Sequence, residues 1–313
     1  MAKPILIDTD TGVDDALALI LAFRSPELSV KAITTVAGNI EVHKCTRNVH
    51  LVLDLLQVKD RPIVAQGAKK PLRRPLVIAS EVHGFDGLGG LSQSLPASEP
   101  HKTGNGVNTI LEFCDRYGSK ATIVAIGPLT NLALALRSDP RVFRKAGRIV
   151  TMGGAFRVPG NTGPVAEFNY FVDPEAAHKV LNSGIPVTVI PLDVTHQVVL
   201  MRKEMEYRAA RRANNVAMAV LKMTRDYMLY HQDTQGFNGG YLHDPMAVAV
   251  AVNPALVKTR RTHVDVESKG EFTRGMTVTD FTDRRPGERG NVHVALTVER
   301  DRFLRLFHER LWK

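Results

Sequence analysis

Residues 4–16 read Pro-Ile-Leu-Ile-Asp-Thr-Asp-Thr-Gly-Val-Asp-Asp-Ala, and this stretch decides both the fold and the chemistry of the chain. Four carboxylates, those of Asp8, Asp10, Asp14 and Asp15, fall within eight residues directly after a short apolar run. Like charges packed this closely are costly unless a cation lies among them. Hard divalent cations such as Ca²⁺ or Mg²⁺ prefer oxygen ligands of this kind. The stretch therefore predicts a metal site at the junction of a strand and a helix.

Short apolar and β-branched runs alternate with segments of helical spacing along the rest of the chain. The runs predict strands over residues 5–8, 30–36, 122–126, 148–152, 187–192 and 291–298. The predicted helices cover residues 14–23, 44–57, 128–137, 174–182, 204–230, 245–252 and 301–312, with a break expected near 214–215. This alternation is typical of an α/β fold, a mostly parallel central sheet with helices on both faces, Rossmann-like in organisation. No linker of Pro, Gly and Ser divides the chain, so we expect a single domain over residues 1–313.

Polar residues stand where the expected strands end. Asp10 follows the first strand, Asn39 follows the second, Met152 ends a later one and Asp193 follows another. Ligands of open α/β sheets bind at the carboxyl ends of the strands, so these distant segments should converge on one pocket. Segments rich in Gly and Pro over residues 84–90, 156–163 and 282–290 are expected to be long surface loops, which often carry function.

The composition limits the class of protein. Hydrophobic residues make up 44% of the 313 residues, which is enough for a full core. No apolar run approaches the roughly 18–20 residues that span a bilayer, and the N-terminus does not read as a secretory signal. We therefore expect a cytoplasmic protein without a membrane partner. The net charge of +9 is spread among acids, which argues against nucleic acid as a partner. Cys45 and Cys114 are expected in the core as free thiols.

The acidic stretch has two other interpretations. A capped helix start explains one or two of the acids but not four, so the metal is favoured. The run Asp8-Thr9-Asp10-Thr11 also fits the template of Mg²⁺-dependent phosphatases, in which Asp8 would attack phosphate and Asp10 would act as acid and base. That alternative needs a downstream Lys and an acidic Mg²⁺ motif, and the sequence shows no clean pair of this kind.

The motif His243-Asp244-Pro245 also has two interpretations. Taken alone, it reads most simply as an Asp N-cap followed by Pro at the first helical position. The functional interpretation makes Asp244 a distal metal ligand and His243 a proton donor.

Three further motifs are compatible with a site or with ordinary structure. Asn161, Glu167 and Asn169 offer amides and a carboxylate that suit sugar hydroxyls, although loop polarity explains them equally well. The segment that begins at His83 is either a turn or a loop that closes over a ligand. Met152 is expected in the core or in a pocket wall.

Together these motifs resemble the nucleoside hydrolases of the inosine–uridine preferring type, and the resemblance covers essentially the whole chain. Each motif is weak alone, but their occurrence in order is a strong signal. The matching segments are Asp8-Thr-Asp-Thr-Gly-Val-Asp-Asp15, Thr35-Val-Ala-Gly-Asn39, His83-Gly-Phe-Asp-Gly-Leu88, Gly127-Pro-Leu-Thr-Asn131, Met152-Gly-Gly-Ala155, Ala166-Glu-Phe-Asn169, Asp173-Pro-Glu-Ala-Ala177, Leu192-Asp-Val-Thr-His196, His243-Asp-Pro245 and Gly275-Met-Thr-Val278. Two departures are visible: Thr11 stands where the family often has Pro, and Phe85-Asp86 replaces an acid-plus-hydroxyl pair.

The resemblance implies a hydrolase that splits the N-glycosidic bond of ribonucleosides, purine or pyrimidine, into ribose and a free base. It implies that Ca²⁺ is held by Asp10, Asp15, Asp244 and the backbone carbonyl of Ile126, together with water and the ribose 2′- and 3′-hydroxyls. Asp10 would take a proton from the attacking water, and His243 would protonate the leaving base. The other implied contacts are Asp14, Asn39, Asn161, Glu167 and Asn169 at the ribose and Phe168 and Tyr230 at the base, with His83 and Met152 expected in the pocket as well.

Relatives of this type form dimers or tetramers, so a homodimer or homotetramer is expected by analogy. The alternative outside the enzymes is a nucleoside-binding protein whose metal is structural. The preference for purines or pyrimidines depends on the shape of the pocket, which the sequence leaves open.

Overall fold

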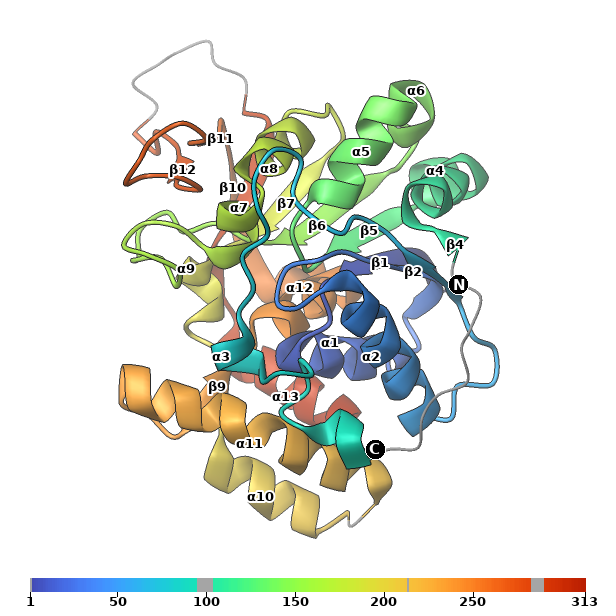
Figure 1. Cartoon of the computed structure of the whole chain (residues 1–313), viewed down its shortest axis with the longest axis vertical. Helices are drawn as coiled ribbons and strands as arrows, with labels where there is room; N and C mark the ends of the chain where they lie inside the picture. Colours follow the sequence, from blue (N-terminus) through green and yellow to red (C-terminus); the bar gives the residue numbers. More distant parts are fainter. Residues whose placement is uncertain (1, 95–103, 213, 283–289) are drawn as a thin grey trace.

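A nine-stranded sheet runs through the computed structural model, which describes residues 2–94, 104–212, 214–282 and 290–313 (Figure 1). The strand order is β10-β13-β7-β6-β5-β1-β2-β3-β4. In that order the strands span Val257–Thr262, Val292–Val298, Val187–Ile190, Arg148–Met152, Thr122–Ala125, Lys3–Thr9, Leu28–Thr35, Ile63–Gln66 and Gly104–Asn105. All neighbours pair in parallel except β10 with β13. The predicted α/β fold with a mostly parallel sheet is confirmed.

The centre of β1, Ile5-Leu6-Ile7, is apolar without interruption because the strand lies in the middle of the sheet with both faces covered. Ile5 and Ile7 pack into the core on one face, and Leu6 packs into the core on the other. This alternation follows from the two-residue repeat of a strand. The strand therefore delivers the acidic residues after it to a defined edge of the sheet.

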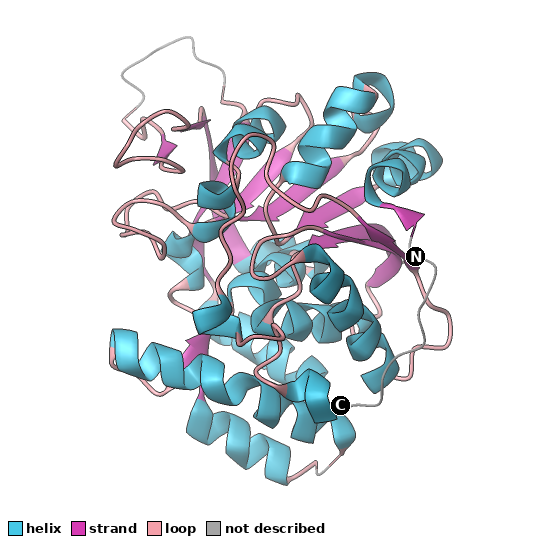
Figure 2. Cartoon of the chain, viewed as in Figure 1, coloured by secondary structure: helices cyan, strands magenta, loops and turns pink. Residues whose placement is uncertain are grey.

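Helices cover both faces of the sheet (Figure 2). One face carries α4 (Gly106–Tyr117), α5 (Thr130–Ser138), α6 (Pro140–Phe143) and α8 (Pro174–Leu181). The other face carries α1 (Val13–Phe23), α2 (Val42–Leu55), α12 (His243–Val252) and α13 (Arg300–Leu311), with α10 (Arg202–Ala210) and α11 (Asn215–Gln235) outside them.

Helix α1 is buried from Val13 to Ala22 because it contacts the sheet, α12, α13 and α11. Asp14 and Asp15 stand in its first turn, where the helix dipole favours negative charge. A helix that is apolar on all sides cannot rotate without exposing core residues, so its first turn is held rigidly at the sheet edge.

Most predicted elements are confirmed, with ends displaced by a few residues. The long segment predicted over residues 204–230 is two helices, α10 and α11, and Asn214 caps the second by accepting from the Ala217 N–H at 2.8 Å. Of the predicted loop 282–290, residues 283–289 lie outside the described residues. The elements that went unpredicted are β3, β4, β10, α4, the 3₁₀ segments, the short helices α3 (Ser80–His83), α6, α7 (Phe168–Val172) and α9 (Leu192–Thr195), and the small pairs β8 (Val199–Met201) with β9 (Gly239–Tyr241) and β11 (Asp265–Val266) with β12 (Thr277–Val278).

Two smaller expectations also have outcomes. Cys45 and Cys114 are buried free thiols, as predicted. Among the described residues, no helix combines the length and the apolar character needed to cross a bilayer.

Candidate active site

The site lies where the strand order reverses. From β1 the sheet extends through β2, β3 and β4 in one direction and through β5, β6 and β7 in the other. Such a switch point opens a crevice at the carboxyl ends of the two central strands. Asn39 after β2, Ile126 after β5 and Met152 at the end of β6 line one pocket, so the predicted convergence is confirmed for these segments. It is wrong for Asp193, which does not line the pocket because its carboxylate accepts from the backbone N–H groups of Phe156 and Arg157.

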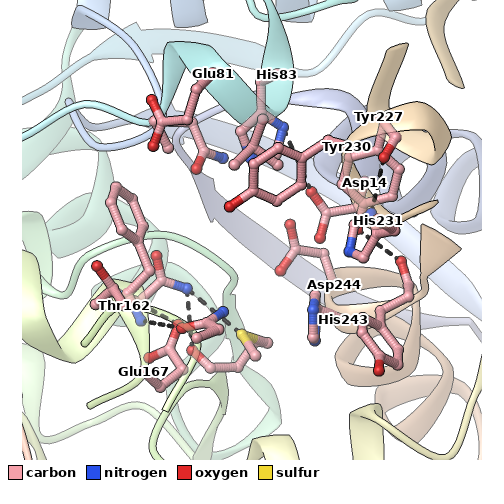
Figure 3. A pocket seen from close by; sticks show the side chains of 18 of the residues that line it. Asp14, Glu81, His83, Thr162, Glu167, Tyr227, Tyr230, His231, His243 and Asp244 are labelled. Atoms are coloured by element: carbon pink, nitrogen blue, oxygen red, sulfur yellow. Dashed lines mark hydrogen bonds and ion pairs between the residues drawn. The ribbon is translucent and has the colours of Figure 1, made fainter. Parts of the chain in front are cut away.

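Three buried carboxylates form a tight cluster at this point. Oxygens of Asp14, Asp15 and Asp244 lie within 4.8 Å of one another. Asp14 and Asp15 come from the start of α1, and Asp244 comes from the first turn of α12, which packs against α1. The carboxylates of Asp14 and Asp244 face each other in the pocket (Figure 3). The cluster thus contains Asp14, which the resemblance assigned to the sugar, beside two of the three carboxylates assigned to the metal.

Asp10 stands directly beside this cluster. Asp10 is completely buried and, like Asp15, does not itself line the pocket. Its Oδ2 accepts from the Asn39 backbone N–H at 2.7 Å, whereas its Oδ1 is buried with no hydrogen-bond partner among the described residues. Asp15 is fully engaged, because Thr9 Oγ1 donates to its Oδ1 at 2.5 Å and Gly12 N–H and Asn39 Nδ2 donate to its Oδ2. A buried carboxylate oxygen without a donor is costly unless a cation or a ligand satisfies it.

The electrostatics of the cluster also favour a cation. Burial, and secondly the neighbouring Asp15, raise the pKa of Asp14 to about 8. Burial and the same group of neighbours raise the pKa of Asp10 and of Asp244 well above the usual range. A divalent cation among these groups would reverse the shifts, because it favours the charged form of each carboxylate. The donor set is oxygen only, which suits a hard cation, and the Ile126 carbonyl lies at the same pocket.

Asp8 is separate from the cluster. It is completely buried in the sheet, where Thr34 Oγ1 and, at 2.8 Å, Asn131 Nδ2 donate to its Oδ1. It does not line the pocket, and burial raises its pKa to about 7. Because Thr34 and Asn131 hold its carboxylate within the sheet, away from the cluster of Asp14, Asp15 and Asp244, Asp8 is not placed as a phosphatase nucleophile, which argues against the phosphatase template.

The simple capping interpretation of His243-Asp244-Pro245 is wrong. Helix α12 begins at His243 with Leu242 as its N-cap, and Asp244 makes no capping hydrogen bond. Its side chain instead turns toward the carboxylates of α1. Tertiary packing of α12 on α1 therefore places Asp244 in the carboxylate cluster, and its role as a metal ligand stays a prediction.

The opposite wall of the pocket is polar and comes from the segment before and within α7. The Glu167 carboxylate caps α7 and accepts from the backbone N–H groups of Asn169, Gly154 and Tyr170 at 2.8, 3.1 and 3.2 Å. Burial raises the pKa of Glu167 to about 7. Asn161 Oδ1 accepts from the Phe168 N–H at 2.9 Å, so the loop 156–163 is tied to this wall.

Asn169 connects the polar wall to the sheet. Its Nδ2 donates to the Ile126 carbonyl at 3.2 Å and to the Met152 carbonyl at 3.4 Å. Asn39, Phe168 and Tyr230 also line the pocket, so every predicted substrate-binding residue reaches it. Their individual roles stay predictions.

Aromatic and histidine side chains form the remaining wall. Tyr227, Tyr230 and His231 project from one stripe of α11, and Tyr227 stacks on His83 with ring centroids 5.9 Å apart (Figure 3). His83 Nδ1 accepts from the Val13 N–H at 3.1 Å and lies 4.0 Å from Asp14 Oδ1. The sequence reasoning missed the other residues of this wall: Val77, Ile78, Ala79, Glu81, Val82, His196, Tyr227, His231, Gln235 and Tyr241, as well as Thr162 opposite.

His243 closes the pocket beside this wall. Its Nδ1 lies 2.7 Å from Thr195 Oγ1, and its ring contacts those of His196 and Tyr241. Burial, followed by the neighbouring histidines His196, His231 and His83, lowers the pKa of His243 well below its usual value.

The segment 84–90 is a turn held by one side chain. Asp86 accepts from the N–H groups of Leu88, Gly90 and Ser92, each at 2.9 Å. Phe85 is 79% exposed and lies under the Lys44 ammonium. The Phe85-Asp86 departure from the family pattern therefore builds the turn without displacing His83, and the turn interpretation is favoured over a closing loop.

A parallel α/β sheet with buried carboxylates at its switch point, facing amides suited to hydroxyl groups, defines an enzyme that acts on a polar small molecule. The family described as "Inosine-uridine preferring nucleoside hydrolase" matches residues 5–305. The chain therefore belongs to the inosine–uridine preferring nucleoside hydrolases, and it is an N-glycosyl hydrolase.

The similarity to individual proteins extends over nearly the full length of both chains. The chain is 45% identical over 312 residues to the pyrimidine-specific ribonucleoside hydrolase RihA of Klebsiella pneumoniae subsp. pneumoniae, covering 99% of both chains. Among solved structures it resembles a plant nucleoside hydrolase, the PpNRh1 enzyme, with a TM-score of 0.93 and 35% identity over 100% and 99% of the two chains. It also resembles a purine-preferring ribonucleoside hydrolase from Gardnerella vaginalis, with a TM-score of 0.90 and 34% identity over 99% and 98%.

Proposed function

We propose that this chain is a Ca²⁺-dependent hydrolase of pyrimidine ribonucleosides that releases ribose and a free base. The observation that carries the proposal is the cluster of Asp14, Asp15 and Asp244, with Glu167 and Asn169 across the same pocket. The pyrimidine preference rests on curated relatives at 45% identity that are named pyrimidine-specific. The choice of Ca²⁺ rests on a donor set made of oxygen atoms alone.

We assign the cation to Asp10, Asp15, Asp244 and the Ile126 carbonyl, with Asp14 inside the same cluster. A bound divalent cation would supply positive charge that acidifies water and favours chelation of vicinal hydroxyls. Asp10 is the acceptor for the proton of the attacking water, because its Oδ1 lies beside the cluster and, unlike either oxygen of Asp15, is buried without a donor among the described residues.

The ribose is held between the acidic cluster and the polar wall. Asn39 and Asp14 contact it from one side, and Asn161, Glu167 and Asn169 contact it from the other. The transition state carries positive charge on the sugar, which nearby carboxylates stabilise in a buried site. Glu167 Oε1 accepts only one of the three backbone hydrogen bonds, so it keeps the capacity to accept from a sugar hydroxyl.

Departure of the base is assisted by His243. The histidine lines the pocket between the acidic cluster and the aromatic wall, where Phe168 and Tyr230 enclose the base. Protonation of the base weakens the N-glycosidic bond, because the base then leaves as a neutral molecule. Water attack and protonation of the leaving group on opposite sides of the sugar is the arrangement of an inverting glycosidase.

A His243→Ala variant is expected to lose at least about 100-fold in kcat on uridine, because an acid catalyst contributes on that order. On a nitrophenyl riboside, whose leaving group needs no proton, kcat should change by less than about threefold. Steady-state assays on both substrates check this. Equal losses on the two substrates would show that His243 does not assist the leaving group.

Removal of the ribose 2′-hydroxyl is expected to lower kcat by at least about 100-fold, because remote binding energy is realised in the transition state. Uridine and 2′-deoxyuridine are compared with and without a chelator, and Ca²⁺ or Mg²⁺ is added back. Ca²⁺ should restore turnover of uridine. Comparable rates on both nucleosides, or full activity in excess chelator, would contradict the proposed grip on the vicinal hydroxyls.

We also propose an oligomeric state and a cellular location for the protein. A homodimer or homotetramer rests on analogy with relatives, and light scattering of the purified chain measures it. A cytoplasmic location rests on the sequence, and fractionation of the producing cell measures it.

A further inference from the structure

Thr195 makes a direct contact with the proposed leaving-group acid. It ends α9, the short helix that follows β7, and it is completely buried. Its Oγ1 lies 2.7 Å from Nδ1 of His243, which is supplied by the first turn of α12. Two segments far apart in the sequence thus meet through one hydrogen bond at the pocket.

The direction of this hydrogen bond follows from counting hydrogens. Among the described residues, the imidazole is the one side chain or carbonyl that bonds to the Thr195 hydroxyl. If the imidazole were the donor, the hydroxyl hydrogen would stay buried without an acceptor, which costs about 1–3 kcal/mol. In the neutral ring the hydroxyl therefore donates to Nδ1, whereas a ring that carries the second proton needed for transfer to the base donates from Nδ1–H to the same hydroxyl oxygen. A neutral imidazole that accepts at Nδ1 carries its hydrogen on Nε2.

We infer that Thr195 is a positioning residue whose hydroxyl holds Nδ1 of His243, as acceptor or as donor, and thereby directs Nε2 toward the departing base. The inference rests on the proposed function, because it presumes that His243 assists the leaving group. Thr195 itself is not expected to touch the substrate, since it does not line the pocket, whereas His243 does (Figure 3).

The surroundings of His243 explain why a single hydroxyl decides its orientation. The ring of Tyr241 lies 5.3 Å from that of His243, and the ring of His196 lies 5.6 Å away. These neighbouring rings restrict the plane of the imidazole. They do not determine which edge of the imidazole faces the pocket, because they form no hydrogen bond with it. Without the Thr195 hydroxyl, rotation by half a turn would exchange Nδ1 with a ring carbon at little cost.

Three substitutions separate this role from simple packing. Thr195→Val keeps the shape and removes the hydroxyl, whereas Thr195→Ser keeps the hydroxyl and removes a methyl group. Thr224→Val is the matched control, because Thr224 is equally buried and its hydroxyl bonds to the Val220 carbonyl within α11. Thermal unfolding of each variant shows that the measured protein is folded.

Thr195→Val is expected to lower kcat on uridine by at least about tenfold, a part of the effect of a general acid, while KM changes by less than about twofold. On the nitrophenyl riboside its kcat should stay within about threefold of the parent, because that leaving group needs no hydrogen bond. Thr195→Ser should restore the uridine rate, and Thr224→Val should affect both substrates equally or neither.

Other outcomes overturn the inference. Equal losses of Thr195→Val on both substrates indicate packing, and an unchanged uridine rate indicates that the hydrogen bond is idle. Failure of Thr195→Ser to recover the rate has the same meaning. The His243→Ala variant distinguishes failure of the proposed function from failure of this inference. If it loses the same factor in kcat on both substrates, the acid role of His243 is refuted. If its loss depends on the leaving group while the loss of Thr195→Val does not, only the positioning role of Thr195 is refuted.

Discussion

An Asp10→Asn variant is expected to lose at least about a thousandfold in kcat on uridine, within the range of a lost general base. The substitution keeps the size of the side chain but removes the negative charge. It also replaces an oxygen with an NH₂ group, either at the unpartnered Oδ1 or at Oδ2, which accepts from the Asn39 N–H. Release of uracil, followed by chromatography, measures the remaining rate.

Asp8→Asn is the control for this variant, because Asp8 lies in β1, two residues before Asp10, and is equally buried. Its carboxylate is bound by Thr34 and Asn131 within the sheet, so the change should lower thermal stability and leave the rate per folded molecule within about tenfold. A near-normal rate in Asp10→Asn would refute the assigned base. Phosphate release from a monoester that disappears only in Asp8→Asn would revive the phosphatase alternative.

An Asp244→Asn variant is expected to bind Ca²⁺ at least about 100-fold more weakly, because affinity follows the number of charged ligands. The same change should have the opposite effect on the metal-free protein. Asp14, Asp15 and Asp10 repel the charge of Asp244, so its removal should raise the melting temperature in chelator. Calorimetric titration with Ca²⁺ and thermal unfolding with and without the ion measure both effects.

The control is Asp226→Asn, which removes an exposed carboxylate from α11 without touching the cluster. It should change neither the affinity for Ca²⁺ nor the melting temperature in chelator. An Asp244→Asn variant that binds Ca²⁺ as the parent does would remove Asp244 from the cation site. A melting temperature that falls in chelator would mean that the cluster is not strained by its charges.

The sheet and the buried helices were predictable because their sequence patterns are compatible with few other structures. The run Ile5-Leu6-Ile7 is apolar on both faces, and α1 and α12 are apolar on all sides, which only a covered parallel sheet and an inner helix layer require. Strands β4 and β10 escaped prediction because the first is two residues long and the second, Val257–Thr262, is an exposed edge strand with charged side chains.

The acidic half of the site was predictable because its charges are neighbours in the sequence and could not be packed together without compensation. The position of Asp244 was ambiguous, since Asp before Pro at a helix start is also a common cap, and only the packing of α12 on α1 shows that its side chain joins the cluster. The aromatic wall was missed because a half-exposed helix does not reveal which stripe faces a cavity. The spacing of Tyr227 and His231 was the available signal.

The two halves of the pocket are built on helices that differ in how deeply they are buried. Asp14, Asp15, His243 and Asp244 lie on α1 and α12, which are both buried. Tyr227, Tyr230 and His231 of the aromatic wall lie on α11, an outer helix with one side in solvent. Substitutions on that outer helix can therefore accumulate without disturbing the hydrolytic machinery. Enzymes of this kind would then diverge in substrate range through substitutions on the outer helix, while the residues that carry out hydrolysis stay the same.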